Sequence, residues 1–210
     1  MTAAGSFEAD ERIRLFCALR LPDTTLDRLV AWQREALDVP GIRPVARPNL
    51  HVTLAFLGHR AAGELEKILV ALREAAARAE LARLTVRSYR ETRSVGMLAF
   101  DDEGGRAASL AADLQLRLQA LGVYEPERRK WLPHVTVVRF RERPRLHPAL
   151  PALEPFVPSD AAAYLSRLRP GGAQYEVLES VDVGGRYEWT ASRLSTPRSA
   201  RSSASSARAR

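Results

Sequence analysis

The sequence predicts an α+β fold in which the sheets are largely antiparallel. Apolar runs of strand length and helix-length segments with one apolar face follow one another in the order β-α-β-α-β-β-α-β-β-β. This order lacks the strict alternation of strands and helices that a doubly wound parallel sheet requires. A four-residue sequence with His and Thr also occurs twice, each time in a strand that follows a helix. The repetition indicates two related lobes.

The first half of the chain alternates strands and helices. The predicted elements are a strand at 14–21, a helix from Thr24 or Thr25 to about Leu37, a strand at 50–57 and a helix at 63–81. Pro40-Gly41 and Arg47-Pro48-Asn49 are turn signals between the first helix and the second strand. Gly58 is expected to end that strand.

The second half contains more strands than helices. The predicted elements are strands at 84–89 and 95–100, a helix at 107–121, and strands at 135–140, 161–168 and 174–183. Gly122 is expected to end the helix, and the proline-rich segment 141–158 is expected to be a loop. The segment 169–173 is expected to form the turn between the last two strands.

Composition divides the chain into a folded body and two flanking segments. We expect an extension at 1–11 that is flexible, a two-lobed domain at 12–191 and a disordered Ser/Arg/Ala-rich tail at 192–210. The net charge of +7 is mainly a property of the tail, because its five arginines leave only +2 for the rest of the chain. A nearly neutral body argues against a broad duplex-binding surface but permits a small basic site.

The sequence carries no signal for secretion or membrane insertion. No apolar run approaches the ~20 residues that span a bilayer, and the N-terminus lacks a basic region followed by an apolar one. The single cysteine, Cys17, lies in an apolar run and is expected in the core. We therefore expect a cytoplasmic protein that forms no internal disulfide.

The repeated sequence is His51-Val52-Thr53-Leu54 and, 83 residues later, His134-Val135-Thr136-Val137. In a strand, residues i and i+2 point to the same face, so each copy presents an imidazole beside a hydroxyl. Imidazoles can transfer protons, and hydroxyls can donate hydrogen bonds to an anion. Two such strands that face one cleft would supply an acid, a base and anion donors, which suffice to cleave a phosphodiester without a metal.

A simpler interpretation is that both histidines are strand residues without catalytic roles. Against it, the chain has only four histidines, and each motif histidine interrupts a run that is otherwise apolar. A buried imidazole without a partner is costly, so its presence there needs a reason. His59 and His147 lack the Thr partner and lie near turns, where surface positions are expected. The sequence has no P-loop and no cluster with metal-ligand spacing.

The segments around both motifs resemble the two-histidine phosphoesterase superfamily, in particular its bacterial and archaeal RNA 2′,3′-cyclic phosphodiesterase branch, also called 2′-5′ RNA ligase. Pro48–Gly58 is similar to the first motif of that branch almost throughout, and Pro133–Arg139 to the second, with Val137 where Leu is more usual. Segments 14–22 and 166–175 resemble its first strand and C-terminal hairpin. The similarity covers about 12–186.

The resemblance implies a bilobal fold with two mainly antiparallel sheets beside a central cleft and helices on the outside. It implies hydrolysis of RNA 2′,3′-cyclic phosphate ends to 2′-phosphates, and reversible ATP-independent 2′-5′ joining. Apart from the resemblance, we expect a monomer that needs no metal or cofactor. His134 would be the base and His51 the acid. Thr53 and Thr136 would hold the non-bridging phosphate oxygens.

The resemblance also implies site roles for the residues five positions after each histidine. Arg139 would lie near the phosphate and Phe56 near the base. Strand parity opposes both roles, because i+5 points to the other face of an ideal strand, so a bulge or a strand end is required. Core packing remains an equal alternative for Phe56. Arg128-Arg129-Lys130-Trp131 is either an RNA contact or a solvated loop anchored by its tryptophan.

Two other functions use the same residues. One is a phosphodiesterase for a small nucleotide with a cyclic phosphate, and the other is a non-catalytic RNA-binding protein. The intact His and Thr of both motifs argue against the second. Activity on RNA ends compared with mononucleotides distinguishes the first from an RNA-directed enzyme.

Overall fold

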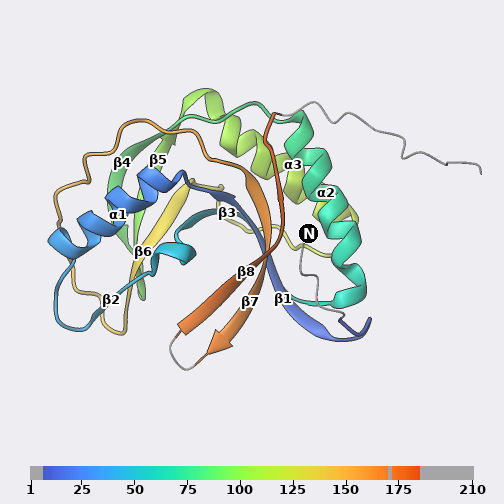
Figure 1. The fold of residues 1–210 in the computed structure, drawn as a ribbon, viewed down its shortest axis with the longest axis horizontal. Helices are drawn as coiled ribbons and strands as arrows, with labels where there is room; N and C mark the ends of the chain where they lie inside the picture. The colour runs from blue at the N-terminus through green and yellow to red at the C-terminus, as the bar shows by residue number, and fades with distance from the viewer. Residues whose placement is uncertain (1–6, 170–171, 185–210) are drawn as a thin grey trace, which may run out of the picture.

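The computed structural model describes residues 7–169 and 172–184 and has the expected α+β fold (Figure 1). The first half comprises β1 (Arg12–Arg20), α1 (Asp23–Ala36), β2 (Ile42–Pro44), β3 (His51–Ala61) and α2 (Leu65–Arg78). The second half comprises β4 (Leu84–Glu91), β5 (Val95–Asp102), α3 (Arg106–Ala120), β6 (His134–Phe140), β7 (Ala161–Arg169) and β8 (Gly172–Val181). Three short 3₁₀ turns precede β3, α2 and α3.

The strands form one curled antiparallel sheet where two were expected. The strand order is β4-β5-β6-β3-β1-β7-β8, and the short strand β2 pairs with β6. Between β3 and β6, only Val52 and Val135 are paired. The two halves are therefore continuous through a single residue pair, and each half contributes one motif strand to the middle of the sheet.

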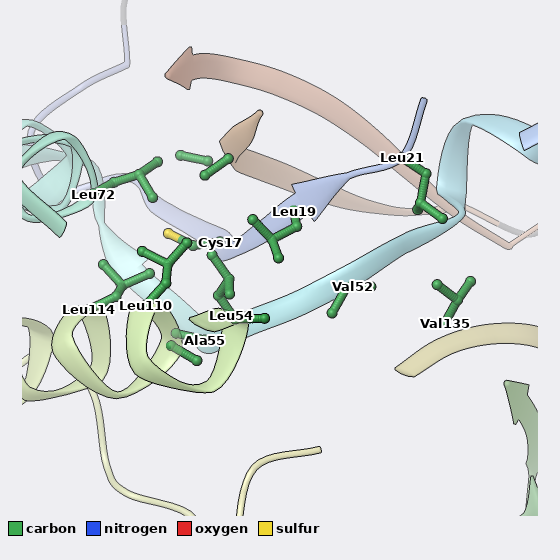
Figure 2. Packing of buried hydrophobic residues seen from close by; sticks show 14 of the residues in the cluster. Cys17, Leu19, Leu21, Val52, Leu54, Ala55, Leu72, Leu110, Leu114 and Val135 are labelled. Atoms are coloured by element: carbon green, nitrogen blue, oxygen red, sulfur yellow. The ribbon is translucent and has the colours of Figure 1, made fainter. Parts of the chain in front are cut away.

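The apolar core lies on the side of the sheet opposite to the motif histidines and threonines. Val52 and Leu54 of β3 are buried, and Figure 2 shows Leu54 beside Leu110 and Leu114 of α3. Cys17 of β1 is also buried there, as expected, and burial raises the pKa of its thiol to about 12. The helices thus cover one face of each motif strand, and the motif histidines and threonines lie on the other, open face.

Several element boundaries differ from the sequence-based expectation. Helix α1 begins after Pro22 and has no side-chain cap, so Thr25 lies buried within the helix instead of capping it. Strand β3 continues through Gly58, whose φ of 70° lets the backbone turn without a break. Helix α2 begins at Leu65, because 62–64 form a 3₁₀ turn. The short strand β2 was not expected, because Pro40 and Gly41 directly before it indicated a turn.

The flanking segments are described only in part. Residues 7–11 of the extension, which was expected to be flexible, contact the body. Phe7 packs against the core, and the carbonyls of Ala9 and Glu11 accept hydrogen bonds from the backbone N–H groups of Gly63 and Ala62, respectively. Residues 1–6 and the whole segment 192–210 lie outside the described residues. No helix in the described ranges is long and apolar enough to cross a membrane.

Candidate active site

All six predicted site residues line one cavity of about 280 Å³ on the open face of the sheet. They are His51, Thr53, Phe56, His134, Thr136 and Arg139. His51 and Thr53 are half-buried, while Val52 between them is buried, and β6 repeats this pattern. The period of two therefore directs both His-Thr pairs into the same cavity, and the central positions of β3 and β6 in the sheet bring the pairs together.

A β-bulge lies at the last residue of each motif. Along β3, Cys17 pairs with Ala55 and Ala18 pairs with Thr53, so Leu54 is an extra residue. Along β6, Gly96 pairs with Val138 and Met97 with Thr136, so Val137 is extra in the same way. Each bulge lies three residues after the motif histidine.

The bulges explain how the residues five positions after the histidines reach the cavity. An extra residue reverses the alternation of faces, so the fifth position returns to the side of the histidine. Phe56 is accordingly 45 % exposed and lines the cavity, and Arg139 does so in β6. The requirement for a bulge is confirmed, and the core alternative for Phe56 is wrong.

Two glutamines that are buried or half-buried hold the carbonyl groups of the bulges. Gln115 of α3 donates from Nε2 to the carbonyl of Leu54 at 2.7 Å. Gln33 of α1 donates to the carbonyl of Val137 at 2.6 Å and also lies 3.0 Å from the carbonyl of Val45. Each bulge therefore depends on a side chain from a helix, and these glutamines were not recognised in the sequence.

The hydrogen bond of His134 fixes its tautomer. Its Nδ1 lies 2.8 Å from the carbonyl of Leu132. Because a carbonyl oxygen only accepts, Nδ1 carries the proton, and Nε2 of the neutral ring holds a free electron pair. This arrangement suits a general base at Nε2.

His51 lies in a more apolar environment. Its ring stacks on Phe16 at a centroid distance of 4.8 Å and meets the edge of Tyr175 at 5.4 Å. Burial lowers its pKa to about 4, and the positive charges of His134 and Arg139 act in the same direction. The Asn49 backbone raises the pKa, although Nδ1 has no hydrogen-bond partner among the described residues. In the free protein at neutral pH, His51 is therefore uncharged.

Polar residues that the sequence did not single out complete the cavity. Arg14 donates to Ser166 Oγ at 3.0 Å, and its guanidinium lies 4.8 Å above the centre of the Phe56 ring. Arg43 of β2 lies directly opposite Arg139 in the register of β2 and β6. No sequence signal marked Arg43, because it lies between turn residues.

The other candidate residues lie outside the cavity. Trp131 donates from its indole nitrogen to the carbonyl of Thr53 at 2.9 Å and packs against the core, which supports the anchoring interpretation. Residues 128–130 are exposed, as are His59 and His147. Within the described part of the chain, no three His, Cys, Asp or Glu side chains are grouped to hold a metal ion.

Comparison with known proteins gives the family. The model of the family described as LigT like phosphoesterase matches residues 19–94. RNA 2′,3′-cyclic phosphodiesterase of Thermus thermophilus is 32% identical over 185 residues, which cover 83% of this chain and 92% of that protein. RNA 2′,3′-cyclic phosphodiesterase of Escherichia coli is 45% identical over 56 residues, or 27% of this chain and 31% of that protein.

Solved structures share the fold. The crystal structure of a Thermus thermophilus protein has a TM-score of 0.71 and 30% identity, with 83% of this chain and 100% of that chain covered. Escherichia coli LigT in complex with NADP+ has a TM-score of 0.67 and 26% identity, with 82% and 99% covered. This chain therefore belongs to the LigT-like phosphoesterase family and is homologous to RNA 2′,3′-cyclic phosphodiesterase, a hydrolase of phosphodiester bonds.

Proposed function

We propose that this protein hydrolyses the 2′,3′-cyclic phosphate at an RNA end to a 2′-phosphate. The observation that carries the proposal is the placement of two His-Thr pairs in one cavity, with an arginine beside them. The similarity to two RNA 2′,3′-cyclic phosphodiesterases supports the same reaction. The cavity volume of about 280 Å³ lies near the lower end of the range for small-ligand sites, which fits one terminal nucleotide.

In the proposed reaction, His134 removes a proton from a water molecule. The water oxygen forms a new bond to phosphorus, and the bond between phosphorus and the 3′ oxygen breaks. His51 gives its proton to the departing 3′ oxygen, which leaves a 3′ hydroxyl and a 2′-phosphate. The bare Nε2 of His134 supports its role as the base.

The role of His51 as the acid requires substrate-linked protonation. Its low pKa in the free protein arises from burial and from positive neighbours. A phosphodiester anion in the cavity offsets both effects, because an opposite charge in contact favours the charged imidazole. The face of Phe16, which stacks on the ring, also favours a cation.

Thr53, Thr136 and Arg139 bind the non-bridging phosphate oxygens in this proposal. Their hydroxyl and guanidinium donors line the cavity with the histidines. As negative charge grows on these oxygens in the transition state, fixed donors stabilise it. Phe56, exposed in the cavity beneath Arg14, offers a flat apolar surface to the terminal base.

The same residues would also join RNA ends through a 2′-5′ linkage. A 5′ hydroxyl takes the place of water, His134 accepts its proton, and His51 again protonates the 3′ oxygen. Because the cyclic diester is exchanged for another diester, no ATP is needed. The NADP+ complex of LigT from Escherichia coli supports a site of nucleotide dimensions.

The experiment supplies an oligoribonucleotide that ends in a 2′,3′-cyclic phosphate and identifies the product isomer. We expect a 2′-phosphate, formed at an unchanged rate in excess chelator. A 3′-phosphate product, or a chelator-sensitive rate restored by a divalent ion, would contradict the proposed chemistry. Adenosine 2′,3′-cyclic phosphate as a parallel substrate distinguishes an RNA-directed enzyme from one that acts on small nucleotides.

A further inference from the structure

A second groove continues from the active-site cavity along the edge of the sheet. It has a volume of about 920 Å³ and is lined by two segments, Pro40–Arg43 and Arg139–Pro144. Arg43 and Arg139 line both spaces, so they form the boundary between them. The two spaces therefore adjoin at these arginines, and a polymer whose end lies in the cavity can extend past them into the groove.

The groove is strongly basic. It contains four arginines and a single carboxylate, that of Glu142. One of the four, Arg143, is paired with a glutamate of β4 at 3.2 Å. The other three, Arg43, Arg139 and Arg141, are exposed and form no ion pair with any of the described residues.

Arginines elsewhere on this nearly neutral body are of two kinds. Arg47, Arg73 and Arg117 each pair with two carboxylates, so their charges are neutralised within the protein. Others, such as Arg78 on α2, form no ion pair with the described residues but line neither the cavity nor the groove. The three unpaired guanidinium groups of the groove lie together and beside a phosphodiesterase cavity. A row of unneutralised positive charges in a concave surface marks an anion-binding site.

The pairing of the strands strengthens this inference. Arg43 and Arg139 are direct partners in the antiparallel register of β2 and β6. Like charges directly opposite one another destabilise a strand pair. An anion bound between the two guanidinium groups would offset that repulsion, whereas an empty surface would not.

We propose that this groove binds the sugar-phosphate backbone of a single RNA strand whose cyclic-phosphate end occupies the cavity. The inference rests on the proposed function and extends it from a terminal nucleotide to a longer chain. Arg43, which lies opposite Arg139, holds the phosphate next to the reacting one, and Arg141 holds a phosphate further along. The lining aromatic, Phe140, is buried, so binding depends on phosphates and not on base stacking.

The test compares substrates of different length. For wild-type and Arg141→Ala protein, kcat/KM is measured with adenosine 2′,3′-cyclic phosphate and with a ten-nucleotide RNA that ends in the same group. We expect the ratio of the RNA value to the mononucleotide value to fall roughly 5-fold in the variant. Arg141→Lys keeps the charge and should restore most of the ratio.

Salt dependence provides a second measurement that does not need turnover. Binding of a fluorescent ten-nucleotide RNA with a 3′-phosphate is followed over a salt series. Loss of one phosphate contact to a single strand should reduce the slope of log K against log salt by about 0.7. Failure of the proposed chemistry would abolish turnover of both substrates in the wild type but leave this binding measurement intact.

The matched control is Arg78→Ala. Arg78 is an exposed arginine of α2, which lies on the side of the molecule opposite to β2 (Figure 1). Its removal changes the net charge equally and should leave the ratio and the slope unchanged. If the Arg141→Ala protein kept both the kcat/KM ratio and the salt slope of the wild type, the proposal that the groove binds RNA would be wrong. It would also be wrong if the ratio and the slope fell instead in Arg129→Ala, in the exposed loop 128–130.

Discussion

His51 and His134 occupy equivalent positions on their strands, but their surroundings differ. His134 has a hydrogen-bonded Nδ1, whereas His51 is enclosed by aromatic rings and has a pKa lowered to about 4. Two motifs of the same pattern therefore place their imidazoles in environments that favour different protonation states. The sequence correctly located both residues but could not reveal this difference, because Phe16 and Tyr175 come from strands β1 and β8, far from His51 in the chain.

The low pKa of His51 predicts that ligand binding is linked to proton uptake. Between about pH 4 and the usual range of histidine, the free folded protein keeps His51 neutral. A bound phosphate should raise the pKa, so binding near pH 6 should take up a proton. The measurement is an NMR titration of the His51 ring with and without a nucleotide 2′-phosphate. A pKa that does not change with ligand would refute the proposed role of His51 as a substrate-charged acid.

Substitution of the motif residues should distinguish the proton-transfer role of the histidines from the phosphate-binding role of the threonines. His51→Ala and His134→Ala should each lower kcat roughly 10²–10⁴-fold, because each removes one proton-transfer group. Thr53→Val or Thr136→Val should cost about 1.5–3 kcal/mol of transition-state stabilisation, the value of a hydrogen bond to a charged group. Thr→Ser at the same positions is the control and should retain most activity. Near wild-type turnover of His134→Ala would exclude the two-imidazole mechanism.

At the level of elements, the two bulges convert a regular strand pattern into an active site. Strand parity alone showed that a bulge was needed for Arg139 and Phe56 to reach the cleft. Its position at Leu54 and Val137 could not be predicted, since the bulge carbonyls are held by Gln115 and Gln33 from distant helices. Such long-range partners leave no periodic signal in the sequence.

The glutamine contact predicts a combined effect on stability and catalysis. Gln115→Leu leaves the Leu54 carbonyl without this donor, which should cost about 1–3 kcal/mol of unfolding free energy. It should also lower kcat/KM, because the bulge directs Phe56 into the cavity. Thermal unfolding and steady-state kinetics measure the two effects. The control is Gln119→Leu, an exposed position on the same helix, which should change neither.

In Gln115→Leu, we expect a larger KM for both the ten-nucleotide RNA and the mononucleotide, because Phe56 is proposed to contact the terminal base that both substrates share. If the variant lost stability but kept the KM of the wild type, Gln115 would have only a structural role. Gln115→Glu keeps the size of the side chain but removes the donor, so it should resemble Gln115→Leu and not the wild type.

At the scale of the whole molecule, the sequence predicted the fold class and both central strands but not the continuity of the sheet. Strand-length runs and helical stripes are local signals, and they survive in the structure with shifts of a few residues. The single pair of Val52 with Val135 joins strands that are far apart in the chain. Short strand β2 was also missed, and with it Arg43, because three residues that contain proline do not form a recognisable pattern.

The distribution of charge over the whole chain gives the last prediction. Five arginines and no acid lie in 193–210, while the rest of the chain carries only +2. Charges of this kind attract phosphates through space without a folded surface. Truncation after Ser192 should therefore leave the unfolding temperature and the turnover of adenosine 2′,3′-cyclic phosphate nearly unchanged, because the segment contains almost no apolar residues to bury.

The same truncation should weaken the binding of RNA longer than the groove. With five charges removed, the slope of log K against log salt should fall by as much as about 3.5 for a single strand, against about 0.7 for the loss of Arg141 alone. Binding of RNAs of ten and forty nucleotides over a salt series separates the two contributions, because a short strand that is held in the groove has little length left for the tail. Superimposable curves for full-length and truncated protein on the long RNA would show that the segment is an inert extension.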